Sequence, residues 1–163
     1  MSQAKTRSSK RQTPSSDAVA IEARSWLGTP YVHQHRAKAV ACDCVGLIIG
    51  VGLELGILPA WTPEAWAEHD AYGRAPNPEH MTRAIRQFMN PLDLAPTELA
   101  PVGSVAFMAW RAGMPMHLGV IGRLPDGRPS LIHAFAHVGR VIEHGFEQEW
   151  PGRVDSWWSY PGL

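Results

Sequence analysis

The sequence has few cysteines, no excess of either charge and no long apolar run. Its two cysteines, Cys42 and Cys44, stand two positions apart. A disulfide over that separation would be strained, and two cysteines cannot build a disulfide framework, so we expect free thiols. The 15 basic side chains are matched by 15 acidic ones, which disfavours a nucleic-acid-binding protein. No apolar stretch reaches the roughly 20 residues that a membrane span requires.

Hydrophobic residues nevertheless make up 45% of the 163 residues, enough for the core of one domain. Residues 1–16 are basic, with no acidic or aromatic side chain. We expect a disordered tail there, or an arm that becomes ordered on a partner. Residues 17–163 are expected to form a single domain. Because the N-terminus has no apolar signal segment, we expect synthesis in the cytoplasm without a signal peptide.

Three helices are predicted in the N-terminal half. An apolar stripe at helical spacing, which includes Leu27, predicts a helix over 17–27. The segment 43–55 is apolar nearly all round, so its helix should be buried. Its three interior glycines indicate close contact with another backbone, most simply a sheet. A segment expected to be irregular, 59–77, then leads to a third helix that starts at Asn77-Pro78.

Beyond Pro101 the pattern changes to short segments separated by turns, which predicts an antiparallel sheet. The strands are expected at 104–110, 117–122, 130–136 and 140–144. Helices followed by such a meander predict an α+β fold, with N-terminal helices packed on a C-terminal antiparallel sheet. The aromatic C-terminus either folds back on the core or presents a patch to a partner or a glycan. Its aromatic residues are Trp150, Trp157, Trp158 and Tyr160.

Cys44 is the strongest candidate for chemistry because it lies in the first turn of the expected buried helix. A helix N-terminus stabilises a thiolate by about 0.3–1 kcal/mol, up to ~2 when partly buried, which does not by itself ionise a thiol at neutral pH. A histidinium about 4 Å away adds roughly 4 kcal/mol at an effective dielectric of about 20. His117 and His133 lie on expected neighbouring strands, where they can meet across the ladder. On spacing alone, the alternative is an inert buried Cys44 with two ordinary strand histidines.

Four segments resemble the NlpC/P60 cysteine peptidases, in the order in which that family carries them. They are Trp26-Leu27-Gly28-Thr29-Pro30-Tyr31, Cys42-Asp43-Cys44-Val45-Gly46-Leu47, His117-Leu118-Gly119-Val120-Ile121 and His133-Ala134. The sequence is most similar to the branch found as cell-wall peptidases of phage or phage-like tails, gene transfer agents included. The resemblance implies a papain-like fold, in which a helix that bears the cysteine packs on an antiparallel sheet that bears the histidines.

The resemblance also implies roles for individual residues. Cys44 would be the nucleophile, His117 the base and His133 the polar residue that orients the base. Tyr31 would place its hydroxyl near the nucleophile, although without the motif it could be a loop residue packed on the helix. Asp43 is expected either to start the helix or to position substrate.

The implied activity is hydrolysis of a peptidoglycan stem peptide, typically at the bond between D-γ-glutamate and a diamino acid, without a cofactor. The implied partners are that peptide and the hub or tip proteins of a phage-like tail, which would carry the protein to the periplasm of a target cell. Two alternatives stay open, a thiol amidase or acyltransferase on the same fold and a non-catalytic component of the particle. Val45, where the family usually has serine, and Ser104, where it often has aspartate, favour the last alternative slightly, and the retained cysteine and histidines oppose it.

No metal site is expected, and the other histidines are given no role. Cys42 and Cys44 with His33 and His35 could suggest zinc, but Cys-x-Cys is poor spacing for it and no second cysteine pair exists. The motif register favours Cys44 over Cys42 as the acting thiol. Four further histidines lie in turns or polar segments and are expected on the surface: His69, His80, His137 and His144.

Overall fold

The computed structural model describes residues 14–60 and 77–163. Within them the helices are α1 (Ser16–Arg24), α2 (Cys44–Glu54) and α4 (Pro78–Phe88), with a short 3-10 helix at Pro151–Arg153. The strands are β1 (Arg36–Ala37), β2 (Ala41–Cys42), β3 (Asn90–Pro91), β4 (Val105–Arg111), β5 (Met114–Arg123), β6 (Pro129–Phe135), β7 (Arg140–Gly145) and β8 (Val154–Ser159). The expected tail, up to residue 13, and most of the expected irregular segment 59–77 lie outside the described residues.

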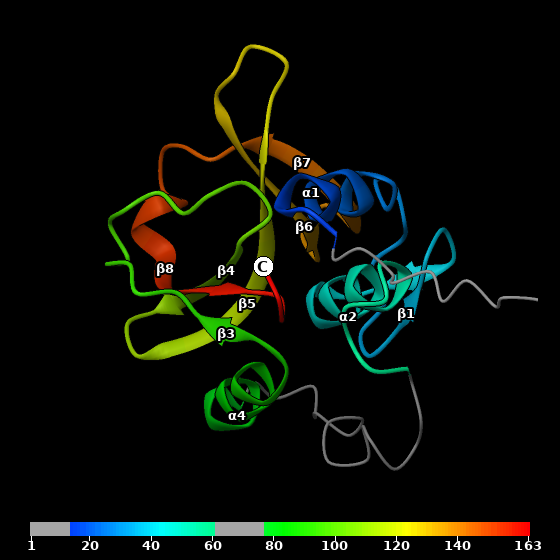
Figure 1. Ribbon diagram of the computed structural model, residues 1–163, viewed down its shortest axis with the longest axis horizontal. Coiled ribbons are helices and arrows are strands. Elements are labelled where there is room, and N and C mark those ends of the chain that lie inside the picture. Colours follow the sequence, from blue (N-terminus) through cyan, green and yellow to red (C-terminus); the bar gives the residue numbers. More distant parts are fainter. Residues whose placement is uncertain (1–13, 61–76) are drawn as a thin grey trace, which may run out of the picture.

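A six-stranded antiparallel sheet forms the centre of the fold, in the order β3-β8-β4-β5-β6-β7. Helices α1 and α2 lie side by side and contact β5 and β6, while α4 packs on β5 (Figure 1). A two-stranded ribbon of β1 and β2 precedes α2. The predicted α+β fold, helices packed on an antiparallel sheet, is confirmed. None of the helices in the described residues is long and apolar enough to cross a membrane.

The first helix is shorter than its apolar stripe. Ser15 caps it by accepting a hydrogen bond from the N–H of Ala18, and the helix ends at Arg24. Trp26 continues the stripe and is buried, but Leu27 lies beyond the helix and is 45% exposed. The prediction that Leu27 belongs to the buried stripe is wrong, because the helical register ends before it.

The glycines of α2 allow close approach, but not by the sheet. A Cβ on Gly46 would collide with the carbonyl group of His35, in the loop before the helix. A Cβ on Gly50 would collide with the indole of Trp26, just beyond α1. The prediction of a sheet backbone as the close partner is therefore wrong. At Gly46 the backbone that approaches α2 belongs to the loop before the helix. The missing Cβ lets that loop pack against the start of the helix.

The C-terminal aromatic segment forms β8, a strand that the turn pattern did not predict. It lies between β3 and β4 and pairs Trp158 with Val105 and Trp157 with Ala106. Both tryptophans and Tyr160 are buried, so this segment folds back on the core. Successive strand residues point to opposite faces, and the two tryptophans accordingly join different apolar clusters, one on each face of the sheet.

Strand alternation gives the two faces of β5 and β6 different neighbours. On the helix side, Leu118, Val120 and Ile132 share a cluster with residues of α1 and α2. On the opposite side, Ile121 and Leu131 belong to the second cluster, with the C-terminal aromatic residues. The side chains at the ends of these two strands form the candidate site.

Candidate active site

Cys44 is the first residue of α2, and Asp43 determines where that helix begins. The Asp43 side chain is buried and caps the helix, because its Oδ1 accepts a hydrogen bond from the N–H of Gly46 at 2.8 Å. Its Oδ2 accepts one from the N–H of Gln34 at 2.7 Å. One carboxylate oxygen binds the helix start and the other binds the preceding loop, so the side chain links the two. This geometry favours the helix-start role of Asp43 over contact with substrate.

The Cys44 thiol lies at the junction between α2 and β5. The residue is only 8% exposed, and the backbone N–H groups of Leu118, Val45 and Cys44 itself donate toward its sulfur. Leu118 directly follows His117 along β5. The helix start and the histidine-bearing strand thus meet at the sulfur atom.

The structure brings the two predicted histidines together. Nε2 of His117 on β5 and Nδ1 of His133 on β6 share a hydrogen bond of 2.7 Å, and both side chains are buried. Gly119 lies beside them, and a Cβ there would stand 3.1 Å from the Cβ of His133 and 2.7 Å from the side chain of Leu131. Glycine at this position leaves the space that the imidazoles occupy.

A third histidine, which the sequence did not single out, extends the pair. Nε2 of His144 on β7 lies 3.0 Å from Nε2 of His133, and Nδ1 of His144 lies 2.8 Å from the carbonyl oxygen of Gly145. In the β6–β7 ladder His144 is opposite Leu131, so it shares a face with His133, two residues further on. The prediction that His144 is an ordinary surface residue is wrong, because this register turns its ring toward His133.

Aromatic side chains surround these imidazoles. The ring centroids of Phe135 and Trp150 lie 5.0 and 4.8 Å from that of His133. Trp110 lies 5.8 Å from His117 and is 38% exposed, so it forms the solvent edge of this aromatic wall. The wall keeps water away from the histidines and makes their charged forms costly.

Burial keeps the resting site uncharged. It raises the pKa of the Cys44 thiol to about 12, and the nearby carboxylate of Asp43 acts in the same direction, although the N–H groups at the sulfur oppose it. Burial lowers the pKa of His117 to about 4 and, together with the adjacent histidines, that of His133 to about 2. The expected thiolate held by a histidinium is therefore wrong for the resting state. Removing both charges from water outweighs the attraction of the helix N-terminus.

Tyr31 and Cys42 lie on the other side of the thiol. Tyr31 is half-buried, and burial raises its pKa to about 12, with Cys44 and Asp43 contributing. Its neutral hydroxyl therefore lies within electrostatic range of the sulfur. Cys42 lies on β2, is fully buried, and has a thiol pKa that burial raises to about 12. Both cysteines are free, and Cys44 is the one that stands at the helix N-terminus beside β5.

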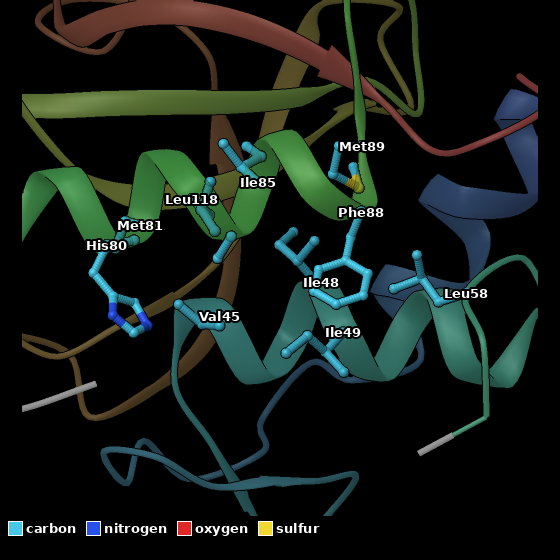
Figure 2. Close-up of a pocket in the computed structure, with 11 residues that line it drawn as sticks. Val45, Ile48, Ile49, Leu58, His80, Met81, Ile85, Phe88, Met89 and Leu118 are labelled. Atoms are coloured by element: carbon cyan, nitrogen blue, oxygen red, sulfur yellow. The ribbon is translucent and has the colours of Figure 1, made fainter. Parts of the chain in front are cut away.

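An apolar groove begins next to the thiol and runs between α2 and α4. Figure 2 shows Ile48 of α2 facing Phe88 of α4 across it, and Val45 at the start of α2 near His80 and Met81. Leu118 of β5 also lines the groove. Val45, one of the residues that line the groove, directly follows Cys44 in the chain.

Of the remaining predicted histidines, His137 reaches the aromatic wall, with its ring centroid 5.3 Å from that of Phe135. Within the described residues, no group of three His, Cys, Asp or Glu side chains is placed to hold a metal ion. His33 lies 3.5 Å from the Asp43 carboxylate, and His35 and His137 are exposed. His80 lines the groove near Val45 (Figure 2), half-buried rather than on the open surface as predicted, because α4 turns it toward α2. His69 lies outside the described residues.

No protein-family model matches the sequence, and no curated protein matches it. Solved structures do match the fold. A lipoprotein-like NLP/P60 family protein from Staphylococcus aureus superposes on 89% of this chain with a TM-score of 0.55 and 15% identity. NlpC2 from Trichomonas vaginalis superposes on 94% of it with a TM-score of 0.55 and 19% identity. The fold is that of the NlpC/P60 proteins.

An N-acetylmuramoyl-L-alanine amidase from Bacteroides uniformis also superposes on 89% of the chain, with a TM-score of 0.53 and 13% identity. The chain spans 41% of the S. aureus protein and 50% of the T. vaginalis protein, and 97% of the amidase. At identities this low, the likeness establishes the NlpC/P60 fold and leaves the activity to be argued from the site.

Proposed function

We propose that the protein is a cysteine peptidase that hydrolyses peptidoglycan stem peptides. The observation that carries the proposal is the thiol of Cys44 at a helix N-terminus, against a strand whose His117 is hydrogen bonded to His133. A nucleophile, a base and a group that orients the base is the arrangement of covalent acyl-transfer catalysis. The motif resemblance and the NlpC/P60 fold support the assignment of roles.

The neutral resting state determines how the reaction would begin. As Sγ of Cys44 attacks the scissile carbonyl carbon, Nδ1 of His117, the nitrogen that does not face His133, takes the thiol proton. The N–H groups of Cys44 and Val45 at the helix start would receive the developing oxyanion, and one such donor is typically worth about 2.7–4 kcal/mol. The charged pair thus forms with the tetrahedral intermediate and does not precede it.

The second half returns every atom to its starting state. The tetrahedral intermediate collapses, His117 gives its proton to the leaving amine, and the acyl group stays on Cys44 as a thioester. Water then attacks the thioester while His117 accepts one of its protons, and the carboxylic product leaves as the thiol is reprotonated.

We further propose the bond between D-γ-glutamate and the diamino acid as the scissile bond. Support comes from the resemblance to the family. The N-acetylmuramoyl-L-alanine amidase of the same fold is named for a different peptidoglycan bond, the one between the muramoyl group and L-alanine, so the products decide between the two bonds. Purified sacculi and defined muropeptides test it, with products identified by mass spectrometry. We expect clearing and a cut at that bond with wild type and Cys42→Ala, and none with Cys44→Ala. Loss of activity through Cys42→Ala alone would overturn the assignment of the nucleophile.

Carriage by a phage-like tail to the periplasm of a target cell is the broader part of the proposal, and its support is the resemblance of the motifs to that branch. Antibodies against the protein should label purified particles at the tail. Labelling of the soluble fraction alone would contradict carriage, and labelled particles with an inactive protein would favour a structural component.

The apolar groove favours a second candidate, acyl transfer by the same thiol. Val45 and Leu118 line it beside Cys44, and such a groove suits an aliphatic acyl chain better than a charged stem peptide. Activated esters of short and long fatty acids separate the two. Acylation of Cys44 that becomes faster with chain length favours acyl transfer, and indifference to chain length favours the peptidase.

A further inference from the structure

The three histidines at the ends of β5, β6 and β7 form one hydrogen-bonded chain that ends on a backbone carbonyl. The contacts run from His117 to His133 at 2.7 Å, from His133 to His144 at 3.0 Å, and from His144 to the carbonyl oxygen of Gly145 at 2.8 Å. His133 and His144 each use one ring nitrogen for one neighbour and the other for the next. This chain uses only Nε2 of His117, so its Nδ1 is not engaged by His133.

The direction of this chain follows from its last member. A carbonyl oxygen can only accept, so Nδ1 of a neutral His144 carries its proton and its Nε2 must accept. Nε2–H of His133 therefore donates to His144, which leaves Nδ1 of His133 as an acceptor. Nε2–H of His117 must then donate to that nitrogen. The Nδ1 of His117 is unprotonated as a consequence, which is the form that a general base requires.

We propose that His144 is a positioning residue that sets the tautomers of His133 and His117 and so keeps Nδ1 of His117 free to accept the Cys44 proton. This inference rests on the proposed function for its catalytic consequence, and on the hydrogen bonds alone for the tautomers. His144 is separated from His117 by His133, so its effect is transmitted entirely through the hydrogen bonds. The ring of Trp150, 4.9 Å from that of His144 between centroids, packs beside it and holds the end of the chain in place.

Replacement of His144 by leucine removes the acceptor for Nε2–H of His133. The His133 ring can then donate through Nδ1 instead, which makes Nε2 of His117 an acceptor and moves the His117 proton to Nδ1. That tautomer offers a donor where the reaction needs a base. A glutamine at the same position keeps a carbonyl oxygen that can accept from His133, so His144→Gln should preserve the direction that His144→Leu loses.

Nitrogen NMR of the full chain labelled at histidine tests the tautomers in the absence of substrate. In wild type we expect the Nε2–H form for His117 and His133 and the Nδ1–H form for His144. In His144→Leu we expect the Nδ1–H form to appear at His117, and in His144→Gln the wild-type pattern to return. His35→Leu, which removes an exposed histidine in the loop before α2, is the matched control. A wild-type His117 in the Nδ1–H form, or an unchanged pattern in a folded His144→Leu, overturns the inference.

Steady-state kinetics with muropeptides provide a second test of the role of His144. We expect kcat of His144→Leu to fall about 10- to 100-fold with KM little changed, the range typical of partners behind a functional histidine, and His144→Gln to recover most of it. If His144→Leu does not fold, the wild-type tautomers and the His144→Gln variant still decide the matter. The expected tautomers in a wild type that cleaves no muropeptide would support the chain and overturn the proposed function, so the two failures are distinguishable.

Discussion

The two faces of strands β5 and β6 have opposite tasks although they alternate along the same residues. One face presents Leu118, Val120 and Ile132 to the helices and is apolar throughout. The other carries His117 and His133, joined by a hydrogen bond and enclosed by aromatic rings. The apolar face holds the sheet to α2, and so determines where the thiol lies. The histidine face carries the hydrogen-bonded imidazoles to which the proposed function assigns the base and the residue that orients it.

This division predicts that side chains one position apart affect different quantities. A substitution on the helix-facing side should lower the free energy of unfolding and leave the activity of the folded molecules intact. A substitution on the histidine face should lower activity far more than stability, because those imidazoles are neutral and their loss costs a hydrogen bond but exposes no buried charge.

The largest expected effect is on activity, from His117→Leu. Without the base, kcat on muropeptides should fall by about 10⁴-fold or more, the order seen when a member of such a catalytic unit is removed. The two side chains have similar volume, but Nδ1 of buried His133 loses its partner, so the free energy of unfolding should fall by about 1–3 kcal/mol. Denaturant unfolding and mass-spectrometric product assays measure the two quantities. Strong unfolding of this variant, or retained turnover, would erase the distinction between the faces.

The complementary variant on the opposite face is Ile132→Ala, next to His133 on β6. Ile132 is fully buried against the helices, and truncation of such a residue costs about 2–5 kcal/mol of unfolding free energy through lost contacts and the cavity that remains. Turnover per folded molecule should stay within about threefold of wild type, since no group of the histidine chain moves. A larger loss of turnover at a temperature where the variant is folded would show that the faces are coupled.

The pH dependence of stability tests the histidine face alone, because the apolar residues on the helix-facing side do not titrate. Burial lowers the pKa of His117 to about 4, so the unfolded chain binds more protons than the folded one between that pH and the unfolded value of about 6.5. The contribution of the neutral imidazole to stability is complete above pH 6.5 and is lost as the pH falls toward 4. It amounts to about 3 kcal/mol at 1.36 kcal/mol per pKa unit, and His133 acts in the same direction.

Urea unfolding at pH 7, 5.5 and 4.5 checks this sign. The wild type should lose stability over that range, and His117→Leu should lose distinctly less, because one of the two depressed histidines is absent. Equal slopes for the two proteins would mean that His117 keeps an ordinary pKa, and the resting site would then not be neutral.

Alternation and helix signals made much of the architecture predictable. The segment 43–55 reads as a buried helix because apolar residues surround it, and Asp43 caps it as expected of an acidic residue in that position. The motifs likewise placed Cys44 at the start of a helix and His117 on a strand, as the structure has them. Local patterns of this kind depend on residues close in the sequence, which is why they could be found there.

The two features that the sequence analysis missed, strand β8 and the role of His144, depend on how the strands pair. β8 carries two adjacent buried tryptophans, so it lacks the polar alternation that marks a strand with one exposed face. The role of His144 depends on the β6–β7 register, which a one-residue slip would reverse. A tight hairpin through Val138 and Gly139, the turn expected from the sequence, would have placed His144 opposite His133. The expected turn could therefore have indicated the third histidine. The protonation states of Cys44 and His117 could not be predicted from the sequence, because they depend on burial.

The smallest of these effects tests how α2 is held at the correct position. Alanine is normally better than glycine inside a helix by about 1 kcal/mol, yet a Cβ on Gly50 would meet the buried indole of Trp26. We therefore expect Gly50→Ala to destabilise the fold by about 1–3 kcal/mol, the usual cost of overpacking. Glu54→Ala, on an exposed position of the same helix, is the control and should change stability by less than about 0.5 kcal/mol. A shift of α2 against Trp26 would also move Cys44 relative to β5. Gly50→Ala should therefore lower turnover of muropeptides in addition to stability. A stabilised Gly50→Ala with normal turnover would show that the Trp26 side chain moves aside, and that contacts with the sheet alone position the helix.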